Sequence, residues 1–202
     1  MILTLIPRAR LDQTLDAFSR RLETGLARDV LARIRLTSPD RAAGATAEQH
    51  RREALSLARE FGIPIHPEGS SSGFNWDGAA LDGGTEAYVI LHEIAHFVLA
   101  PPERRGLVDF GLGPGPDTTD RAAAEAAAVI SLAERDGEEA EASLLGIVWE
   151  AALGQPALAS FLDQNWLEGL ERSAAAHFTA VLRRLEAQGL LEPLERLSRR
   201  GE

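Results

Sequence analysis

The chain has 202 residues, no cysteine and a formal net charge of −10. The lack of cysteine excludes disulfides and thiolate ligands, so a bound metal must be held by His, Asp or Glu. The acidic balance argues against non-specific nucleic-acid binding, which needs a basic surface, and is compatible with a basic protein partner.

The composition predicts a predominantly helical α+β fold, with a small sheet formed by the N-terminal half. Alanine, leucine and arginine predominate, and the 45% of hydrophobic residues is enough for a core. We expect a single domain over residues 1–202, with an N-terminal α/β portion (1–82), a metal-site core (83–169) and C-terminal helices (170–202). No signal peptide is visible and no apolar run reaches about 18 residues, so we expect a cytoplasmic protein without membrane contact.

The first part of the chain predicts two strands and two helices. Residues 2–6 suit a short strand, and apolar side chains recur at helical spacing over 11–27. Residues 30–36 alternate between apolar and polar side chains, which is typical of a half-buried strand. A Thr-x-x-Gln pattern that resembles a capping box predicts a helix over 46–61, which Gly62 ends.

A long loop separates this part from the next helix. Residues 63–66 suit a short extended segment, and residues 67–84 are rich in Gly, Ser, Asp and Asn, which predicts a loop. The loop carries two aromatic side chains, Phe74 and Trp76. They indicate either a packed turn or a wall of an active site.

The second half of the chain predicts helices separated by Gly and Pro. The first covers about 85–99 and is stopped by Pro101-Pro102. The others are expected at 117–134 and 139–153, with a break at Asp136-Gly137, and then, after a break at Gly154-Gln155-Pro156, at 167–188 and 193–198.

The expected helix over 85–99 contains His92-Glu93-Ile94-Ala95-His96. Residues four apart lie one turn apart on the same side of a helix, so both imidazoles can reach one metal ion. Glu93 lies on an adjacent face, from which a carboxylate can take a proton from a water molecule that a divalent ion acidifies. The flanking residues are bulky and apolar, which predicts a buried helix in which these polar groups need partners. The alternative is a pair of core histidines bonded to backbone or carboxylates.

A third protein ligand is needed, because catalytic metal sites usually have three and one open position. His50, His66 and His177 lie in settings typical of a helix surface, a strand end and a helix interior. A carboxylate from a later helix is a better candidate. The candidates are Glu125, Glu138, Glu139 and Glu141.

The stretch HEIAHFVLAPPERRGLVDFG resembles the active-site segment of the elongation factor P hydroxylase family. That family carries a His-Glu-Ile-x-His-aromatic run, an arginine pair and a Leu-x-Asp-Phe-Gly element. In this chain these fall on His92 to Phe97, Arg104-Arg105 and Leu107 to Gly111. A later stretch, Glu139 to Gly169, is similar to the next helix of the family and its sequel, and the whole resemblance covers roughly residues 83–169.

The resemblance implies oxygen-dependent hydroxylation of a modified lysine on a translation factor. The implied cofactor is a non-haem iron held by two histidines and a carboxylate, a ligand set that suits Fe(II) and oxygen. Matched without gaps, the glutamate of the family falls on Glu139, so His92, His96 and Glu139 are the implied ligands. We therefore expect a hydroxylase-like enzyme that acts on a protein or amino-acid side chain, with a basic protein as its partner.

Four further residues receive expected roles. Glu93 acts as a base or positions a bound water or oxygen species. Asp109 orients a ligand histidine or caps a turn. Arg104 and Arg105 hold an anionic substrate group or an acidic partner helix, or lie at a solvated helix end.

Two alternatives stay open. Ligand type does not distinguish iron from zinc, so Fe(II) is favoured and zinc is possible. With zinc, the chain would be a metallopeptidase of the compact gluzincin type, with Glu93 as general base. The other alternative is a non-catalytic helical interaction domain with a relic or structural site.

Overall fold

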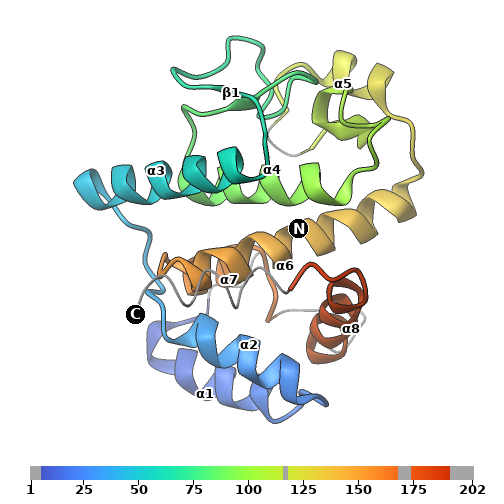
Figure 1. Cartoon of the computed structure of the whole chain (residues 1–202). Helices are drawn as coiled ribbons and strands as arrows, with labels where there is room; N and C mark the ends of the chain where they lie inside the picture. Colours follow the sequence, from blue (N-terminus) through green and yellow to red (C-terminus); the bar gives the residue numbers. More distant parts are fainter. Residues whose placement is uncertain (1–5, 116–117, 168–173, 192–202) are drawn as a thin grey trace. The chain divides into compact units, whose positions relative to one another are not determined.

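The computed structural model describes residues 6–115, 118–167 and 174–191. Within them it contains eight α-helices, one 3-10 helix and a two-stranded parallel sheet in the N-terminal half, which confirms the predominantly helical α+β fold (Figure 1). The elements are α1 (Arg8–Ser19), α2 (Gly25–Arg35), α3 (Gly44–Glu60), β1 (Ile65–His66), β2 (Leu81–Asp82), α4 (Ala87–Leu99), η1 (Val108–Gly111), α5 (Arg121–Ala127), α6 (Leu132–Ala152), α7 (Ala157–Asp163) and α8 (Ala174–Ala187). None of the helices in these residues has the length and apolar character needed to cross a membrane.

The described residues fall into two units. The first combines the chain before residue 42 with the chain after residue 146, and the second is the continuous segment 42–146. Helix α6 begins in the second unit and ends in the first. These boundaries differ from the expected portions at 82 and 169, and the single domain stays a prediction.

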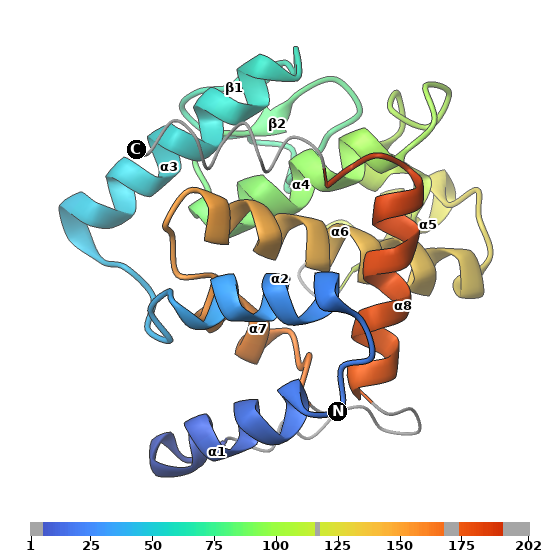
Figure 2. The same cartoon turned by 60° about the horizontal axis from the view of Figure 1, so that its bottom comes forward.

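The first unit is built from α1, α2, α7 and α8. Helix α2 packs against α7 and α8 (Figure 2), and α1 also contacts α8. Its core is aromatic: Phe18 lies edge-on against Phe161 and Phe178, and Trp166 stacks on Phe161. Burial of these large rings supplies much of the apolar area that stabilises this unit.

The predicted strand over 30–36 is wrong, because residues 30–35 belong to helix α2 and Leu36 is its C-cap. The Thr24 hydroxyl accepts a hydrogen bond from the Ala27 amide at 3.2 Å and so caps the helix start. Burial falls on Val30, Leu31 and Ile34, which is helical spacing, whereas Leu36 is 88% exposed. The helix predicted over 11–27 is also too long, since α1 ends at Ser19 and a new helix begins at Gly25.

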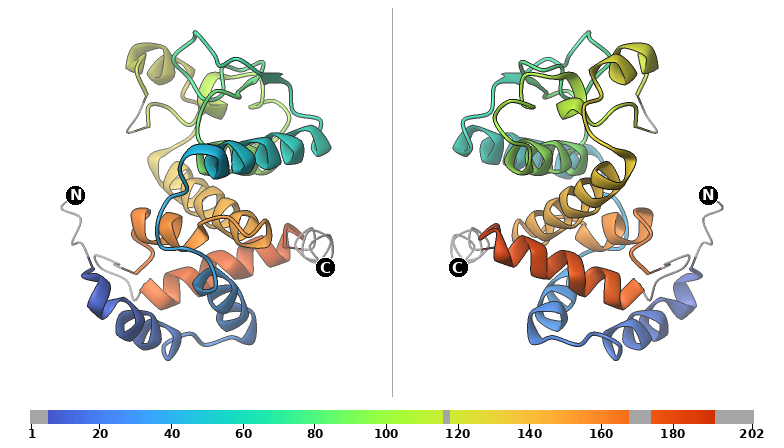
Figure 3. Two further views of the ribbon diagram at one scale, coloured as in Figure 1. Left: turned by 90° about the vertical axis from the view of Figure 1, so that its left-hand side faces the viewer. Right: turned by 90° about the vertical axis from the view of Figure 1, so that its right-hand side faces the viewer.

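The second unit places α3 and α4 side by side, with the loops and the small sheet on one side of the pair (Figure 3). Helix α3 begins at Gly44 without a side-chain cap, so the predicted capping box at Thr46 is wrong. Gly62 ends it in a left-handed conformation (φ 69°), as predicted. The extended segment at 63–66 is confirmed by β1, which pairs in parallel with β2, a strand within the predicted loop.

The predicted break at Asp136-Gly137 is also wrong, because α6 is continuous from Leu132. The break lies instead at the residues before Leu132, where a capping box forms. The Glu134 carboxylate accepts from the Ser131 amide at 2.9 Å, and the Ser131 hydroxyl accepts from the Glu134 amide at 3.3 Å. The helix predicted over 117–134 is therefore reduced to α5.

The remaining expectations fall on the C-terminal part and the first residues. The break at 154–156 is confirmed, since α6 ends at Ala152 and α7 begins at Ala157. Helix α8 lies inside the predicted range 167–188. The helix expected at 193–198 and, apart from Ile6, the strand expected at 2–6 lie outside the described residues.

Candidate metal centre

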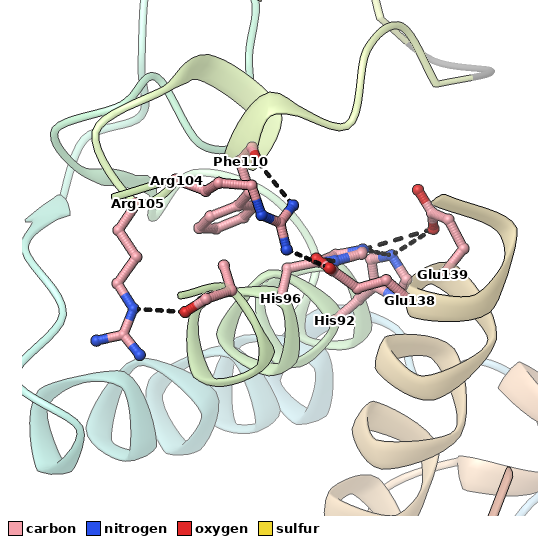
Figure 4. Close-up of polar contacts among 8 residues, drawn as sticks. His92, His96, Arg104, Arg105, Phe110, Glu138 and Glu139 are labelled. Atoms are coloured by element: carbon pink, nitrogen blue, oxygen red, sulfur yellow. Dashed lines mark hydrogen bonds and ion pairs between the residues drawn. The ribbon is translucent and has the colours of Figure 1, made fainter. Parts of the chain in front are cut away.

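Helix α4 presents two histidines on one side. Its apolar residues Ile90, Leu91 and Ile94 are fully buried, which fixes the helix in the core of its unit. His92 and His96 lie one turn apart, and their Nε2 atoms are 3.0 Å from each other. Both imidazoles therefore direct the same nitrogen to one point (Figure 4).

Helix α6 brings a carboxylate to that point. Oε2 of Glu139 lies 3.5 Å from Nε2 of His92 and 3.5 Å from Nε2 of His96. One ligand atom from each of the three residues lies within 4.8 Å of the other two. Two imidazoles and one carboxylate at this separation form a donor set that fits a divalent metal ion.

A glycine lets the two helices approach so closely. A Cβ atom on Gly146 would lie 3.3 Å from the backbone nitrogen of His92. Gly146 follows Glu139 by two turns of α6, so both lie on the same side of that helix. The small residue at the contact thus sets the distance at which Glu139 meets the histidines.

The charges at the centre favour a cation. Burial alone would lower the pKa of His96, but hydrogen bonds to the carboxylates of Glu138 and Glu139 outweigh it and raise that pKa to about 10. Burial alone would raise the pKa of Glu139. The hydrogen bonds and charges of His92 and His96 outweigh burial and hold that pKa well below the ordinary value. The carboxylates therefore stabilise positive charge at the imidazoles, and a divalent ion can take the place of a proton there.

A second glutamate of α6 lies behind His96. Oε1 of Glu138 is 3.5 Å from Nδ1 of His96, and its Oε2 pairs with Nη2 of Arg104 (Figure 4). Nη1 of Arg104 donates to the carbonyl of Phe110 at 3.0 Å. Arg104 is only 8% exposed, so this pair is part of the core rather than a surface ion pair.

Glu93 lies between the two histidines in sequence and is half-buried. Burial raises its pKa, with the two histidines acting in the opposite direction. The side-chain amide of Asn75 donates to Oε1 of Glu93 at 3.5 Å, a long contact. A carboxyl group with a raised pKa next to a cation site is suited to holding and moving a proton.

Trp76, one of the two aromatic residues of the loop, packs beside the candidate centre. Trp76 stacks on Phe110 with ring centroids 5.1 Å apart, and Phe110 in turn stacks on His96 at 5.8 Å. The Trp76 indole N–H donates to the carbonyl of Arg105 at 2.9 Å. The rings thus form a continuous apolar layer that ends on a candidate ligand.

The segment around Asp109 has an unusual backbone. Asp109 and Phe110 both have positive φ angles, 44° and 53°, a backbone conformation that residues other than glycine rarely adopt. The Asp109 amide donates to the Trp76 carbonyl at 3.0 Å, and the Thr118 hydroxyl donates to its carboxylate at 3.3 Å. Burial, followed by the charge of Glu93, raises the pKa of Asp109 to about 6.

The predicted site residues thus lie in different places. The structure brings His92, His96 and Glu139 together, and among the four candidate glutamates it puts Glu138 behind His96. Glu125 is exposed on α5, and neither it nor Glu141 belongs to the group of possible ligands. Asp109 contacts Thr118, and its predicted role in orienting a histidine stays a prediction.

Both arginines contact the protein itself. Arg105 donates from Nε to the carbonyl of Ala100 at 3.0 Å, and its guanidinium lies 4.6 Å from the ring centroid of Phe97. The interaction of Arg104 with Glu138 is the feature that sequence reasoning missed. The only sequence feature that pointed to it was the presence of an arginine pair and a run of glutamates in the same predicted portion, residues 83–169.

Comparisons of this chain with known protein families, with curated proteins and with solved structures find no match. The similarity to the elongation factor P hydroxylases therefore rests on the short motifs described above.

Proposed function

We propose that this protein is a non-haem iron enzyme that uses oxygen to hydroxylate a protein or amino-acid side chain, as the resemblance to elongation factor P hydroxylases implies. The observation that carries the proposal is the convergence of His92 and His96 from α4 with Glu139 from α6. This set was expected from sequence, and two histidines with one carboxylate are typical of non-haem Fe(II) oxygenases.

The residues of the chain have separate roles in this proposal. His92, His96 and Glu139 hold the metal, and a bound Fe(II) would supply the activation of dioxygen. Glu93 holds or moves a proton beside them, because burial raises its pKa. Trp76 and Phe110 keep water away from the His96 side of the centre.

The proposed substrate is a basic protein, such as a translation factor. The net charge of −10 favours approach of a basic surface. Side-chain exposure is 26% for His92 and 40% for Glu139 against 3% for His96, so substrate would arrive from the side of His92 and Glu139. A translation-factor substrate would require a cytoplasmic enzyme, which stays a prediction.

The test is oxygen consumption by protein purified under nitrogen and then loaded with Fe(II). The proposal predicts uptake by the wild type that is lost in His96→Ala and kept in the matched control His50→Ala, whose histidine lies on α3. Iron-loaded wild type that binds the metal but consumes no oxygen with any basic protein or peptide supplied would overturn the proposal.

A zinc metallopeptidase is the second candidate, and the environment of Glu93 favours it. A carboxyl group with a raised pKa beside two histidines matches the general base of such enzymes. This candidate predicts tight zinc binding and peptide cleavage that disappears in Glu93→Gln without loss of zinc. Absence of cleavage across a broad peptide library would argue against it.

A further inference from the structure

We infer that Glu138 is a positioning residue which, held in place by Arg104, orients His96 with Nδ1 protonated and Nε2 directed to the metal. The inference deepens the proposed function and rests on the His92–His96–Glu139 metal centre. It concerns residues that lie behind the ligands and away from the metal itself.

The first step is the placement of the two ring nitrogens of His96. Nε2 faces His92 and Glu139, which is the side of the metal. Nδ1 lies 3.5 Å from Oε1 of Glu138, and neither of these two buried atoms has another hydrogen-bond partner in the described part of the chain. Nδ1 of His96 is therefore placed to donate a hydrogen bond to Oε1 of Glu138.

The second step is the protonation of a metal-ligating imidazole. An imidazole that binds a metal through Nε2 must carry its proton on Nδ1, and a carboxylate acceptor at Nδ1 selects that tautomer. Glu138 offers such an acceptor at the correct nitrogen. Without the carboxylate, His96 could protonate Nε2 instead and lose its lone pair toward the metal.

The third step is the support of Glu138. Arg104 binds Oε2 of Glu138 and the carbonyl of Phe110 with different nitrogens, so its guanidinium ties α6 to the strained η1 segment. Phe110 also stacks on His96. Because Arg104 is buried and both nitrogens are engaged, its geometry fits positioning better than the expected contact with an anionic substrate.

The first measurement uses the wild type. Histidine side chains in ¹⁵N-labelled, Zn²⁺-loaded protein are followed by ¹H–¹⁵N correlation spectra, which report the protonated nitrogen of each ring. The inference predicts that His96 carries a slowly exchanging proton on Nδ1 and binds zinc through Nε2. A proton on Nε2, or zinc on Nδ1, overturns it whether or not any variant folds.

The second measurement is Zn²⁺ affinity by competition with a chromophoric chelator. Glu138→Gln is expected to weaken binding about 10- to 100-fold, the usual effect of removing an outer-shell partner. The matched control Glu103→Gln removes the same charge from an exposed residue and should change affinity less than about twofold. Equal affinities for wild type and Glu138→Gln would overturn the inference.

A pair of lysine variants separates positioning from charge. Arg104→Lys keeps the charge but cannot contact Glu138 and Phe110 at once, so zinc affinity should fall. Arg105→Lys is its neighbour control and should leave affinity unchanged, because Arg105 contacts Ala100 and Phe97. Equal behaviour of the two variants would contradict a role for Arg104.

The outcomes for the inference and for the proposed function are distinct. A wild type that binds no zinc overturns both the metal centre and the role of Glu138. Zinc binding with the predicted His96 proton, but no oxygen uptake with iron, overturns the hydroxylase proposal and leaves the inference intact.

Discussion

Two glutamates on the same helix, Glu139 and Glu150, differ in what surrounds their carboxylates. Glu139 faces two histidines, which hold its pKa well below the ordinary value although burial opposes them. Burial dominates at Glu150 and raises its pKa to about 7, although Ser160 and Arg41 act in the opposite direction. The difference teaches that burial of the 3% exposed Glu150 favours its protonated form, whereas imidazole neighbours keep the 40% exposed Glu139 an anion that can bind a cation.

The surroundings of Glu150 are those of a structural core. Nη1 of Arg41 lies 3.6 Å from Oε1 of Glu150 and donates to the Ser160 hydroxyl at 2.7 Å, and its Nη2 donates to Asp163 at 2.9 Å. These contacts connect α6, α7 and the segment before α3 within the first unit. Within the described residues, the ion-pair partner of Glu150 is Arg41, and the groups that shift its pKa are Ser160, Arg41 and Asp163 rather than histidines.

The largest expected effect is on metal affinity, which should depend on Glu139 and not on Glu150. Glu139→Gln removes a ligand, so Zn²⁺ or Fe(II) affinity should fall by more than the roughly 100-fold typical of outer-shell changes. Glu150→Gln should bind metal as the wild type does. Titration under nitrogen measures both affinities, and metal binding that survives Glu139→Gln would remove Glu139 from the ligand set.

The second prediction concerns Glu150 and the pH dependence of folding stability. The pKa of Glu150 is higher in the folded protein, about 7, than its ordinary value of 4.5. The contribution of Glu150 to the free energy of unfolding is therefore fully present below about pH 4.5 and is lost as the pH rises through 7. The total loss is on the order of 3 kcal/mol. Glu150→Gln should flatten the free energy of unfolding between these pH values and raise it at pH 8.

Urea unfolding at several pH values measures this effect. Glu103→Gln is the control, because Glu103 is exposed and is not among the groups that shift the pKa of Glu150, so the slope assigned to Glu150 should remain. An unchanged slope in Glu150→Gln would show that other groups cause the pH dependence.

The close approach of α4 and α6 provides a smaller effect on the metal side. Gly146→Ala places a Cβ atom 3.3 Å from the His92 backbone nitrogen, so the helices must separate by a few tenths of an ångström. Overpacking of this kind costs about 1–3 kcal/mol, and metal affinity should fall as Glu139 moves from the histidines. Thermal denaturation and metal titration measure the two effects.

Gly137→Ala is the matched control on the same helix. A Cβ atom there meets nothing within 4 Å, so the change should stabilise the protein by up to about 1 kcal/mol through helix propensity. If both alanines stabilise and both leave metal binding intact, the tight contact at Gly146 does not set the geometry of the centre.

The smallest expected effect concerns the start of α6. Ser131→Ala removes the reciprocal cap with Glu134 and should cost about 1 kcal/mol. Thr46→Ala is the control, because Thr46 resembles a capping residue in sequence but lies exposed within α3. Chemical denaturation of both variants checks the difference, and equal losses would contradict this assignment of caps.

These elements show how far sequence reasoning extends. Helical spacing and the apolar flanks sufficed to predict α4, and the spacing of His92 and His96 sufficed to place two candidate ligands side by side. The strand predicted at 30–36 failed because Val30 and Ile34 satisfy both an alternating and a helical pattern, and only tertiary burial decides between them. The break at Gly137 failed because a glycine inside a long, well-capped helix is tolerated.

The candidate site was predictable only in part, for a physical reason. The residues themselves left four glutamates open, since a contact between two helices depends on which face of α6 meets α4. Close approach at Gly146 and the ion pair of Arg104 with Glu138 are tertiary features without a local signal. The same applies to Asn75, which reaches Glu93 from a loop.

X-ray absorption spectroscopy of the iron-loaded protein tests the central claim most directly, because its fine structure reports the atoms bound to the metal. The account predicts one iron per chain, with two imidazole ligands and otherwise oxygen ligands, and loss of one imidazole in His92→Ala. Iron that binds without imidazole, or a spectrum unchanged in His92→Ala, would contradict it.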